Sequence, residues 1–242
     1  MNHLFDISGR VALVTGGRRG IGRTMALALH QAGAKVAVVA KSSDRCDLPT
    51  DIFYFQVDLS QRKERLHVIE RVIEHYGHLD ILVNNAGIIH SQNVLDYTPD
   101  IWDELLAVNL TAVFELSQSA ARVMKGGKII QMGSISSFSG ARNMVGYASV
   151  KHGLIGMIKC LSNELMPLGI NVNGIAPGLI ETEMQQSLMS DKNRLKEVVG
   201  RIPAGRLGTP NDLIGALLFL ASDASQYVSG TSILIDGGWC GR

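Results

Sequence analysis

The chain has 242 residues, of which 46% are hydrophobic, and its formal net charge is +1 at pH 7. This size and apolar content suit one large domain with an ample core, and we expect residues 1–242 to form a single α/β domain. The near-neutral charge and the lack of a dense Lys/Arg run argue against nucleic acid as the main partner. Cys46, Cys160 and Cys240 lack C-x-x-C spacing, so neither a disulfide framework nor a metal site is expected.

The N-terminal residues MNHLFDISGR contain no apolar stretch of the signal-peptide type. Strongly apolar runs such as Leu213–Ala221 are far too short to cross a bilayer. We therefore expect a cytoplasmic protein with no membrane partner.

The segment Val11–Gly22, VALVTGGRRGIG, has the pattern of a buried strand that passes through a glycine-rich turn into a helix. Glycines allow a sharp turn and let backbone N–H groups approach an anion, and the N-terminus of the helix adds partial positive charge. The predicted ligand of this turn is a diphosphate group. The alternative is a tight strand–helix turn that binds nothing, because the spacing Gly16-x-x-x-Gly20-x-Gly22 departs from G-x-G-x-x-G.

Apolar strand-like runs alternate with helical patterns along most of the chain, which is typical of a parallel sheet covered by helices on both faces. After the first strand, we expect strands at Lys35–Ala40, Ile52–Val57, Leu79–Val83, Lys128–Met132, Ile170–Ile175 and Thr231–Ile235. The predicted helices after the first are Gln61–Tyr76, Thr98–Met124, Tyr147–Met166, Thr182–Val199 and Pro210–Ser222. The connection between the second and third strands is short and polar and contains a proline, so we expect no full helix there.

Several polar or glycine-rich segments follow directly on these strands. They are GGRRG after the first strand, NNAG after the fourth, GSISS after the fifth and PGLIET after the sixth. Ligands of open parallel sheets bind outside the carboxyl ends of the strands. This convergence favours a binding site at that edge.

Tyr147 and Lys151 lie four residues apart near the start of a predicted helix, so both side chains project from one face. A lysine ammonium near a tyrosine stabilises the phenolate and lowers its pKa, which makes the pair suitable for proton transfer. Ser134 follows the fifth strand and is placed to donate a hydrogen bond to a substrate oxygen. The alternative is a packed tyrosine, a surface lysine and a turn serine, with Ser136, Ser137 and Ser139 as rivals to Ser134.

The ordered set of motifs resembles the short-chain dehydrogenase/reductase family over essentially the whole chain. The set consists of TGGRRGIG, NNAG at Asn84–Gly87, Asn109, Ser134, YASVK at Tyr147–Lys151 and Pro177-Gly178. The resemblance implies a Rossmann-like, doubly wound sheet of about seven parallel strands. It also implies a homodimer or homotetramer that transfers hydride between NAD(P) and an alcohol or carbonyl.

The resemblance also implies roles for individual residues. Tyr147 would be the general acid/base, Lys151 would bind the nicotinamide ribose and lower the pKa of Tyr147, and Ser134 would orient the reacting oxygen. Asn109 would hold a water in a proton relay. The implied cofactor-binding positions are Gly16, Arg18, Arg19, Gly20, Ile21, Gly22, Lys41, Ser42, Asp58, Leu59, Asn84, Ala86, Gly87, Pro177, Gly178, Ile180 and Thr182, together with Tyr147 and Lys151.

The end of the second strand favours NADP(H) over NAD(H). A carboxylate at this place would bind a ribose 2′-hydroxyl, whereas the chain has Ala40 followed by Lys41 and Ser42. Lys41 and Arg19 are suited to pair with a 2′-phosphate. The alternative is that both are solvated surface charges and that NAD(H) is the cofactor, with Asp44 nearby.

The C-terminal half resembles the sugar-acid branch of the family, such as 2-keto-3-deoxygluconate and gluconate dehydrogenases. Its first part, RIPAGRLG at Arg201–Gly208, is shared with 3-oxoacyl-carrier-protein reductases. The candidate substrate contacts are His90, Arg142, Met184 and Trp239, each of which has a purely structural alternative. We expect residues 181–199 to form a lid over the site, with Gly178 and Gly200 as hinges.

Three function classes remain to be compared. The leading one is an NADP-preferring dehydrogenase or ketone reductase, with a 3-oxoacyl-thioester reductase or a broad carbonyl reductase as its variants. Halohydrin dehalogenation on the same scaffold is disfavoured because the glycine turn and Lys151 are intact. A nucleotide-sensing protein without turnover is disfavoured because Tyr147 and Lys151 are both present.

Overall fold

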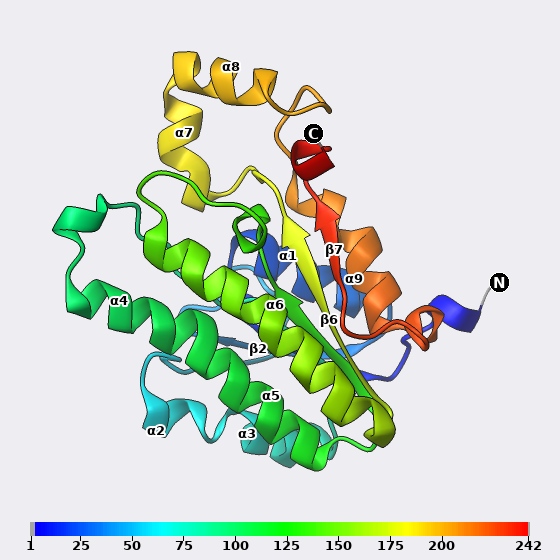
Figure 1. Cartoon of the computed structure of the whole chain (residues 1–242). Coiled ribbons are helices and arrows are strands. Elements are labelled where there is room, and N and C mark those ends of the chain that lie inside the picture. The colour runs from blue at the N-terminus through cyan, green and yellow to red at the C-terminus, as the bar shows by residue number, and fades with distance from the viewer. Residues whose placement is uncertain (1–2, 242) are drawn as a thin grey trace.

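Seven parallel strands form one sheet in the computed structural model, which describes residues 3–241 (Figure 1). The order across the sheet is β3-β2-β1-β4-β5-β6-β7, so the direction of winding reverses between β1 and β4. Such a switch point leaves a crevice at the carboxyl ends of the two strands. The strands are β1 (Val11–Thr15), β2 (Lys35–Ala40), β3 (Phe53–Gln56), β4 (Ile81–Asn84), β5 (Gly127–Met132), β6 (Ile170–Pro177) and β7 (Ser232–Ile235).

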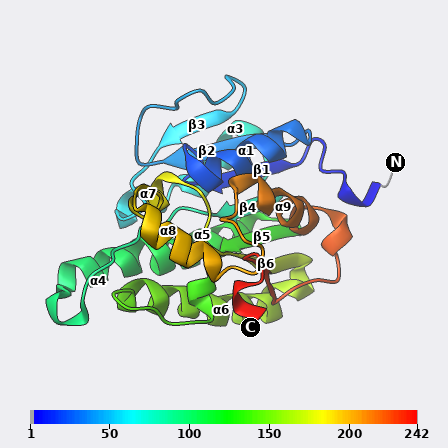
Figure 2. The same ribbon diagram turned by 90° about the horizontal axis from the view of Figure 1, so that it is seen from above.

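Helices cover both faces of the sheet, which confirms the predicted doubly wound α/β fold (Figure 2). One core lies between the sheet and α1 and α9, and the other between the sheet and α3, α5 and α6. No helix within residues 3–241 is long and apolar enough to cross a membrane. The helices are α1 (Gly20–Gln31), α2 (Arg62–Arg65), α3 (Val68–Tyr76), α4 (Pro99–Leu106), α5 (Ala112–Val123), α6 (Val145–Leu165), α7 (Gln186–Ser190), α8 (Lys192–Gly200) and α9 (Ile214–Ala221).

Three of the predicted helices are interrupted. The helix expected at Gln61–Tyr76 is divided into α2 and α3, with His67 as the N-cap residue of α3. Residues 182–199 divide at Asp191, whose carboxylate accepts hydrogen bonds from the N–H groups of Asn193 and Arg194 and caps α8. The helix expected at Thr98–Met124 continues from α4 to α5 through a π-helical turn, Ala107–Thr111. Periodicity alone does not detect such a turn because it adds one residue without ending the helix.

A buried ion pair attaches α2 to α5, the helix that continues from the π turn. The Nε of Arg65 donates to Glu115, and its Nη1 donates to the carbonyl oxygens of Leu59 and Ser60, both at 3.0 Å. Arg62 contacts the other oxygen of Glu115 at 3.0 Å. The two arginines differ in exposure, since 4% of the Arg65 side chain is accessible against 74% for Arg62.

Glu115→Ala is expected to lower the free energy of unfolding by about 3 kcal/mol, because it leaves a buried guanidinium without its counter-ion. Arg62→Ala is the matched control, since it removes an exposed partner of the same carboxylate and is expected to cost less than about 1 kcal/mol. Urea denaturation followed by circular dichroism measures both. Equal losses for the two variants would contradict a special role for the buried pair.

Candidate active site

The glycine-rich turn joins the end of β1 to the start of α1 at the switch point of the sheet. Gly16 and Gly20 have φ angles of +65° and +54°, in the left-handed region that favours glycine. A Cβ on Gly16 would lie 2.9 Å from the Cα of Ala86, so this turn and the NNAG turn pack main chain against main chain. Arg19 is the N-cap residue of α1 and makes no capping bond with its side chain. The N–H groups at this end of α1 therefore lack a side-chain cap, which suits an anionic ligand.

Thr15 and Asn85 fix the relative position of the two turns, and the sequence interpretation did not select either residue. The Oγ1 of Thr15 accepts hydrogen bonds from the N–H groups of Asn85 and Ala86 at 3.0 and 2.9 Å. The Nδ2 of Asn85 donates to the carbonyl oxygens of Thr15 and Gly16 at 2.9 and 3.3 Å. The available signal was a polar threonine at the end of an otherwise apolar strand.

Asn84 and Leu59, two of the expected cofactor-binding positions, have their side chains inside the protein. The Asn84 amide is buried and donates to Ser117 and Gln131 at 3.0 and 3.3 Å, so its side chain supports the end of β4 from below. Leu59 packs in the core on the α3 side of the sheet. Both side chains are thus used inside the protein. Ala86 and Gly87 lie in the turn itself, where a Cβ on Gly87 would lie 3.1 Å from the Oδ1 of Asn109.

The structure brings Ser134, Tyr147 and Lys151 together as predicted. Tyr147 and Lys151 are in the first two turns of α6, and Ser134 follows β5. The Lys151 ammonium lies 5.5 Å from the centroid of the Tyr147 ring and donates to the carbonyl oxygen of Met132 at 2.6 Å. The Ser134 hydroxyl acts on the Tyr147 phenol and favours a lower pKa for it. A hydroxyl donor, a phenol and an ammonium therefore converge at the carboxyl end of β5.

Burial shifts the pKa values of both ionisable groups toward their neutral forms. Desolvation lowers the pKa of Lys151 from 10.5 to about 8. Desolvation also raises the pKa of Tyr147, and the effect of Ser134 offsets only part of this shift. Perturbed groups that lie side by side at the edge of a parallel sheet are typical of a catalytic site.

Asn109 lies at the centre of the π turn and is buried. Its Oδ1 accepts from the N–H of Ile88 at 2.9 Å, and its Nδ2 donates to the carbonyl oxygen of Ile88 at 2.8 Å. These two hydrogen bonds connect the π turn to Ile88, the residue that directly follows the NNAG turn. Single π turns inside α-helices frequently occur at functional sites.

Four cationic side chains surround the crevice, and the structure gives each of them an acidic partner. The pairs are Arg18 with Asp44 at 2.7 Å, Arg19 with Glu183 at 2.5 Å, Arg23 with Asp47 at 2.5 Å and Lys41 with Asp58 at 2.8 Å. Arg19 extends toward residues 181–199, whereas Lys41 pairs with Asp58 near the end of β2. Arg18 contacts the loop that also contains Ser42.

Asp58 lies between β3 and the crevice and carries a negative charge. Burial opposes its ionisation, but hydrogen bonds from Lys41 and Ser60 outweigh this effect and hold its pKa below the usual value. The Lys41 side chain is 75% exposed, so its charge is accessible to a ligand.

The segment after β6 borders the crevice on the other side. A Cβ on Gly178 would lie 2.8 Å from the Cα of Asp236, so Pro177-Gly178 is closely packed against the chain after β7. Ile180 is buried in the core, whereas the Cγ2 of Thr182 would lie 3.7 Å from a Cβ on Gly20. Only Thr182 of this pair turns its side chain toward the glycine turn.

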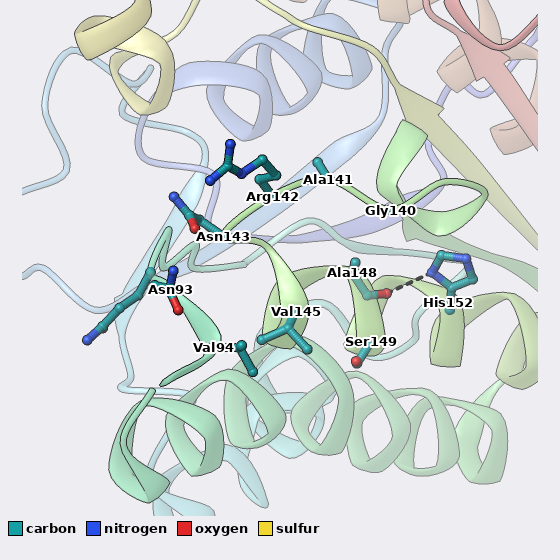
Figure 3. Close-up of a pocket in the computed structure, with 11 residues that line it drawn as sticks. Asn93, Val94, Gly140, Ala141, Arg142, Asn143, Val145, Ala148, Ser149 and His152 are labelled. Atoms are coloured by element: carbon teal, nitrogen blue, oxygen red, sulfur yellow. Dashed lines mark hydrogen bonds between the residues drawn. The ribbon is translucent and has the colours of Figure 1, made fainter. Parts of the chain in front are cut away.

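The four candidate substrate residues are not gathered in one pocket. His90 contacts Glu104 at 3.1 Å, Met184 is half exposed, and the Trp239 ring lies 4.9 Å from the Arg201 guanidinium. Only Arg142 lines the cavity of about 630 Å³ between residues 92–94, the 140–143 loop and α6 (Figure 3).

This cavity lies on the outer side of α6. Its helix residues are Val145, Ala148, Ser149 and His152, which share one face, and the His152 ring contacts the carbonyl oxygen of Ala148 at 2.9 Å (Figure 3). Tyr147 and Lys151 are on another face of the helix. The cavity is therefore separate from the catalytic groups.

The described residues fit a dinucleotide cofactor. The glycine turn offers close backbone approach and an uncapped helix N-terminus for a diphosphate, and the crevice is bordered by exposed cations for further phosphate. The half-buried Tyr147 phenol and Ser134 hydroxyl lie with the buried Lys151 ammonium at the same edge of the sheet.

Comparison with known proteins identifies dehydrogenases and reductases that are similar to this chain. The family model described as enoyl-(acyl carrier protein) reductase matches residues 16–240. The chain is 38% identical over 248 residues to 2-dehydro-3-deoxy-D-gluconate 5-dehydrogenase of Escherichia coli, with 98% of each chain covered. It is 36% identical over 241 residues to the 3-oxoacyl-[acyl-carrier-protein] reductase of the same organism, with 96% of this chain and 98% of the relative covered.

A solved structure of gluconate 5-dehydrogenase from Burkholderia cenocepacia, in complex with NADP and tartrate, superposes with a TM-score of 0.94. It shares 34% sequence identity, and the match covers 99% of this chain and 98% of that chain. The shared sheet, the matched length and the Ser–Tyr–Lys geometry agree, so the chain belongs to the short-chain dehydrogenase/reductase family of oxidoreductases.

Proposed function

We propose that the protein transfers hydride between NADP(H) and the alcohol or carbonyl group of a sugar acid, with Tyr147 as general acid/base. The observation that carries this proposal is the buried Lys151 ammonium beside Tyr147 and Ser134 at the carboxyl end of β5. A phenol is a poor proton-transfer group near neutral pH unless a neighbouring positive charge stabilises its anion. Lys151 supplies that charge from a fixed position, because the Met132 carbonyl holds its ammonium group.

Each of these side chains has a distinct part in the reaction. The Tyr147 hydroxyl gives a proton to the substrate oxygen during reduction and takes it back during oxidation. The Ser134 hydroxyl donates a hydrogen bond to the same oxygen and orients it. The nicotinamide cofactor supplies or accepts the hydride. Asn109 holds the chain after NNAG in place and is proposed to position a water in the proton relay.

The cofactor would lie across the switch point. The glycine turn from Gly16 to Gly22 would receive the diphosphate, Asp58 the adenine, and Thr182 the nicotinamide amide. Lys41, Ser42 and Arg18 would receive the 2′-phosphate, since they surround the end of β2. The Burkholderia relative, crystallised with NADP, supports this choice over NAD.

The proposed substrate class follows from the relatives that act on sugar acids. The identity to a 3-oxoacyl-[acyl-carrier-protein] reductase is nearly as high, so a 3-oxoacyl-thioester reductase is the second candidate. Arg142, the sequence-based candidate for a substrate carboxylate, lines the cavity on the outer side of α6, so the choice between the two candidates rests on the relatives.

We further propose that residues 1–242 act as one cytoplasmic domain, with residues 181–199 as the lid, in a homodimer or homotetramer. Exposed apolar side chains on α4 and α5, Trp102, Phe114 and Val123, support self-association. Light scattering of the purified protein would measure the assembled mass.

Tyr147→Phe should lower kcat by at least about 100-fold, because it removes the proton donor and little else. The Kd for NADPH should stay within about twofold of the wild-type value, since no phosphate contact is lost. Steady-state kinetics and fluorescence titration measure the two effects. Tyr227→Phe, at a fully exposed tyrosine, is the control, and substantial activity in Tyr147→Phe would refute the assigned role.

Lys41→Ala should raise the Kd for NADPH about tenfold, the size of one lost charge-assisted phosphate contact, and that for NADH less than about twofold. Lys35→Ala is the matched control, because Lys35 is exposed at the opposite end of the same strand. Fluorescence titration with both nucleotides gives the result. An equal loss for NADPH and NADH would show that Lys41 does not recognise the 2′-phosphate.

A substrate panel separates the two candidate functions. We expect NADP⁺-dependent oxidation of gluconate-type acids, or NADPH-dependent reduction of their keto forms, with kcat/KM at least about tenfold above that for 3-oxoacyl thioesters, because one additional bound carboxylate contributes more than about 1.4 kcal/mol. Turnover of the thioesters alone would favour the reductase instead.

A further inference from the structure

Glu183 belongs to a different segment of the chain from Asp44 and Asp47, the carboxylates that pair with Arg18 and Arg23. Asp44 and Asp47 belong to the loop between β2 and β3, whereas Glu183 starts the short 3₁₀ turn Glu183–Gln185 on the substrate side. It follows Thr182 and precedes Met184. The Arg19–Glu183 ion pair therefore links the glycine turn to the first part of residues 181–199.

The Arg19–Glu183 pair involves the residue that directly precedes α1. Arg19 is the N-cap residue of the helix, and its Nη1 lies 2.5 Å from the Oε2 of Glu183. Gly20 packs toward Thr182, so the Glu183 turn rests on the glycine turn. The Arg19 guanidinium favours negative charge here, and Glu183 supplies it.

The pair is weak enough for a ligand to break. The Arg19 and Glu183 side chains are 68% and 67% exposed, and solvent-exposed ion pairs contribute only about 0–1 kcal/mol. The 2′-phosphate, a monoester, carries more charge than a carboxylate and offers three acceptor oxygens to a guanidinium, and the diphosphate carries one negative charge on each of its phosphates. Arg19 cannot neutralise both anions at once, so the two compete.

We infer that the Glu183 carboxylate competes with the dinucleotide for Arg19. When the dinucleotide binds, one of its phosphate groups displaces Glu183 from the Arg19 guanidinium. This inference rests on the proposed nucleotide function. The phosphate is either in the diphosphate, which NADH and NADPH share, or the 2′-phosphate, which only NADPH carries. Displacement frees Glu183 together with Thr182 and Met184, so cofactor binding is coupled to the segment proposed as the lid.

The test compares nucleotide binding by variants that break the pair from either side. Glu183→Gln should tighten binding about two- to fivefold, the size expected for an exposed ion pair, and this gain should shrink at high salt. Arg19→Gln should weaken binding, and the Arg19→Gln/Glu183→Gln double variant should match Arg19→Gln alone. Glu197→Gln, a charge removal on α8 in the same segment, should leave the Kd unchanged.

Fluorescence titrations with NADH and NADPH in parallel identify the phosphate. Tightening for both nucleotides supports competition with the diphosphate, and tightening for NADPH alone supports competition with the 2′-phosphate. Unchanged or weaker binding by Glu183→Gln, or tightening that persists without Arg19, would overturn the inference while the proposed function stands. A wild-type protein that binds neither nucleotide would overturn both.

Discussion

The parallel pairing of β1 with β4 is the constraint on which the site depends. Leu13 pairs with Leu82 and Val14 with Val83, so the two strands end at the same edge of the sheet. Only this register allows Thr15 to accept hydrogen bonds from the NNAG turn and lets Gly16 pack against Ala86 without a side chain between them. The crevice for an anion is therefore a product of strand order, not of the glycine turn alone.

The catalytic groups depend on the next pairing, between β4 and β5. Gln131 faces Asn84 and Ser117 inside the sheet–helix layer, while the following Met132 carbonyl accepts the hydrogen bond from Lys151. Burying an ammonium is costly, and the lowered pKa of Lys151, about 8, reflects that cost. The end of β5 thus holds the ammonium beside the Tyr147 ring.

Charge around the crevice is balanced within the chain. Arg18, Arg19, Arg23 and Lys41 each have a carboxylate partner, although their exposed fractions differ. Because exposed ion pairs are weak, a phosphate group of a ligand can replace the carboxylate partner of a cationic side chain at little cost in free energy. The carboxylate partners then influence the affinity for a phosphate-bearing ligand as much as the cationic side chains do.

The sequence by itself determined the alternation of strands and helices, the seven-stranded parallel sheet, the glycine turn and the Ser134–Tyr147–Lys151 group. The sheet, the glycine turn and the Tyr147–Lys151 pair follow from local patterns, namely apolar runs, glycine spacing and the i, i+4 relation on a helix, whereas the resemblance to the family selects Ser134. Tertiary structure alone decided that Asn84 and Leu59 turn into the interior, that Asn109 lies in a π turn and that Arg19 pairs with Glu183. Those outcomes depend on contacts between residues distant in sequence, up to 164 positions apart for Arg19 and Glu183, and no local pattern encodes which partner a side chain meets.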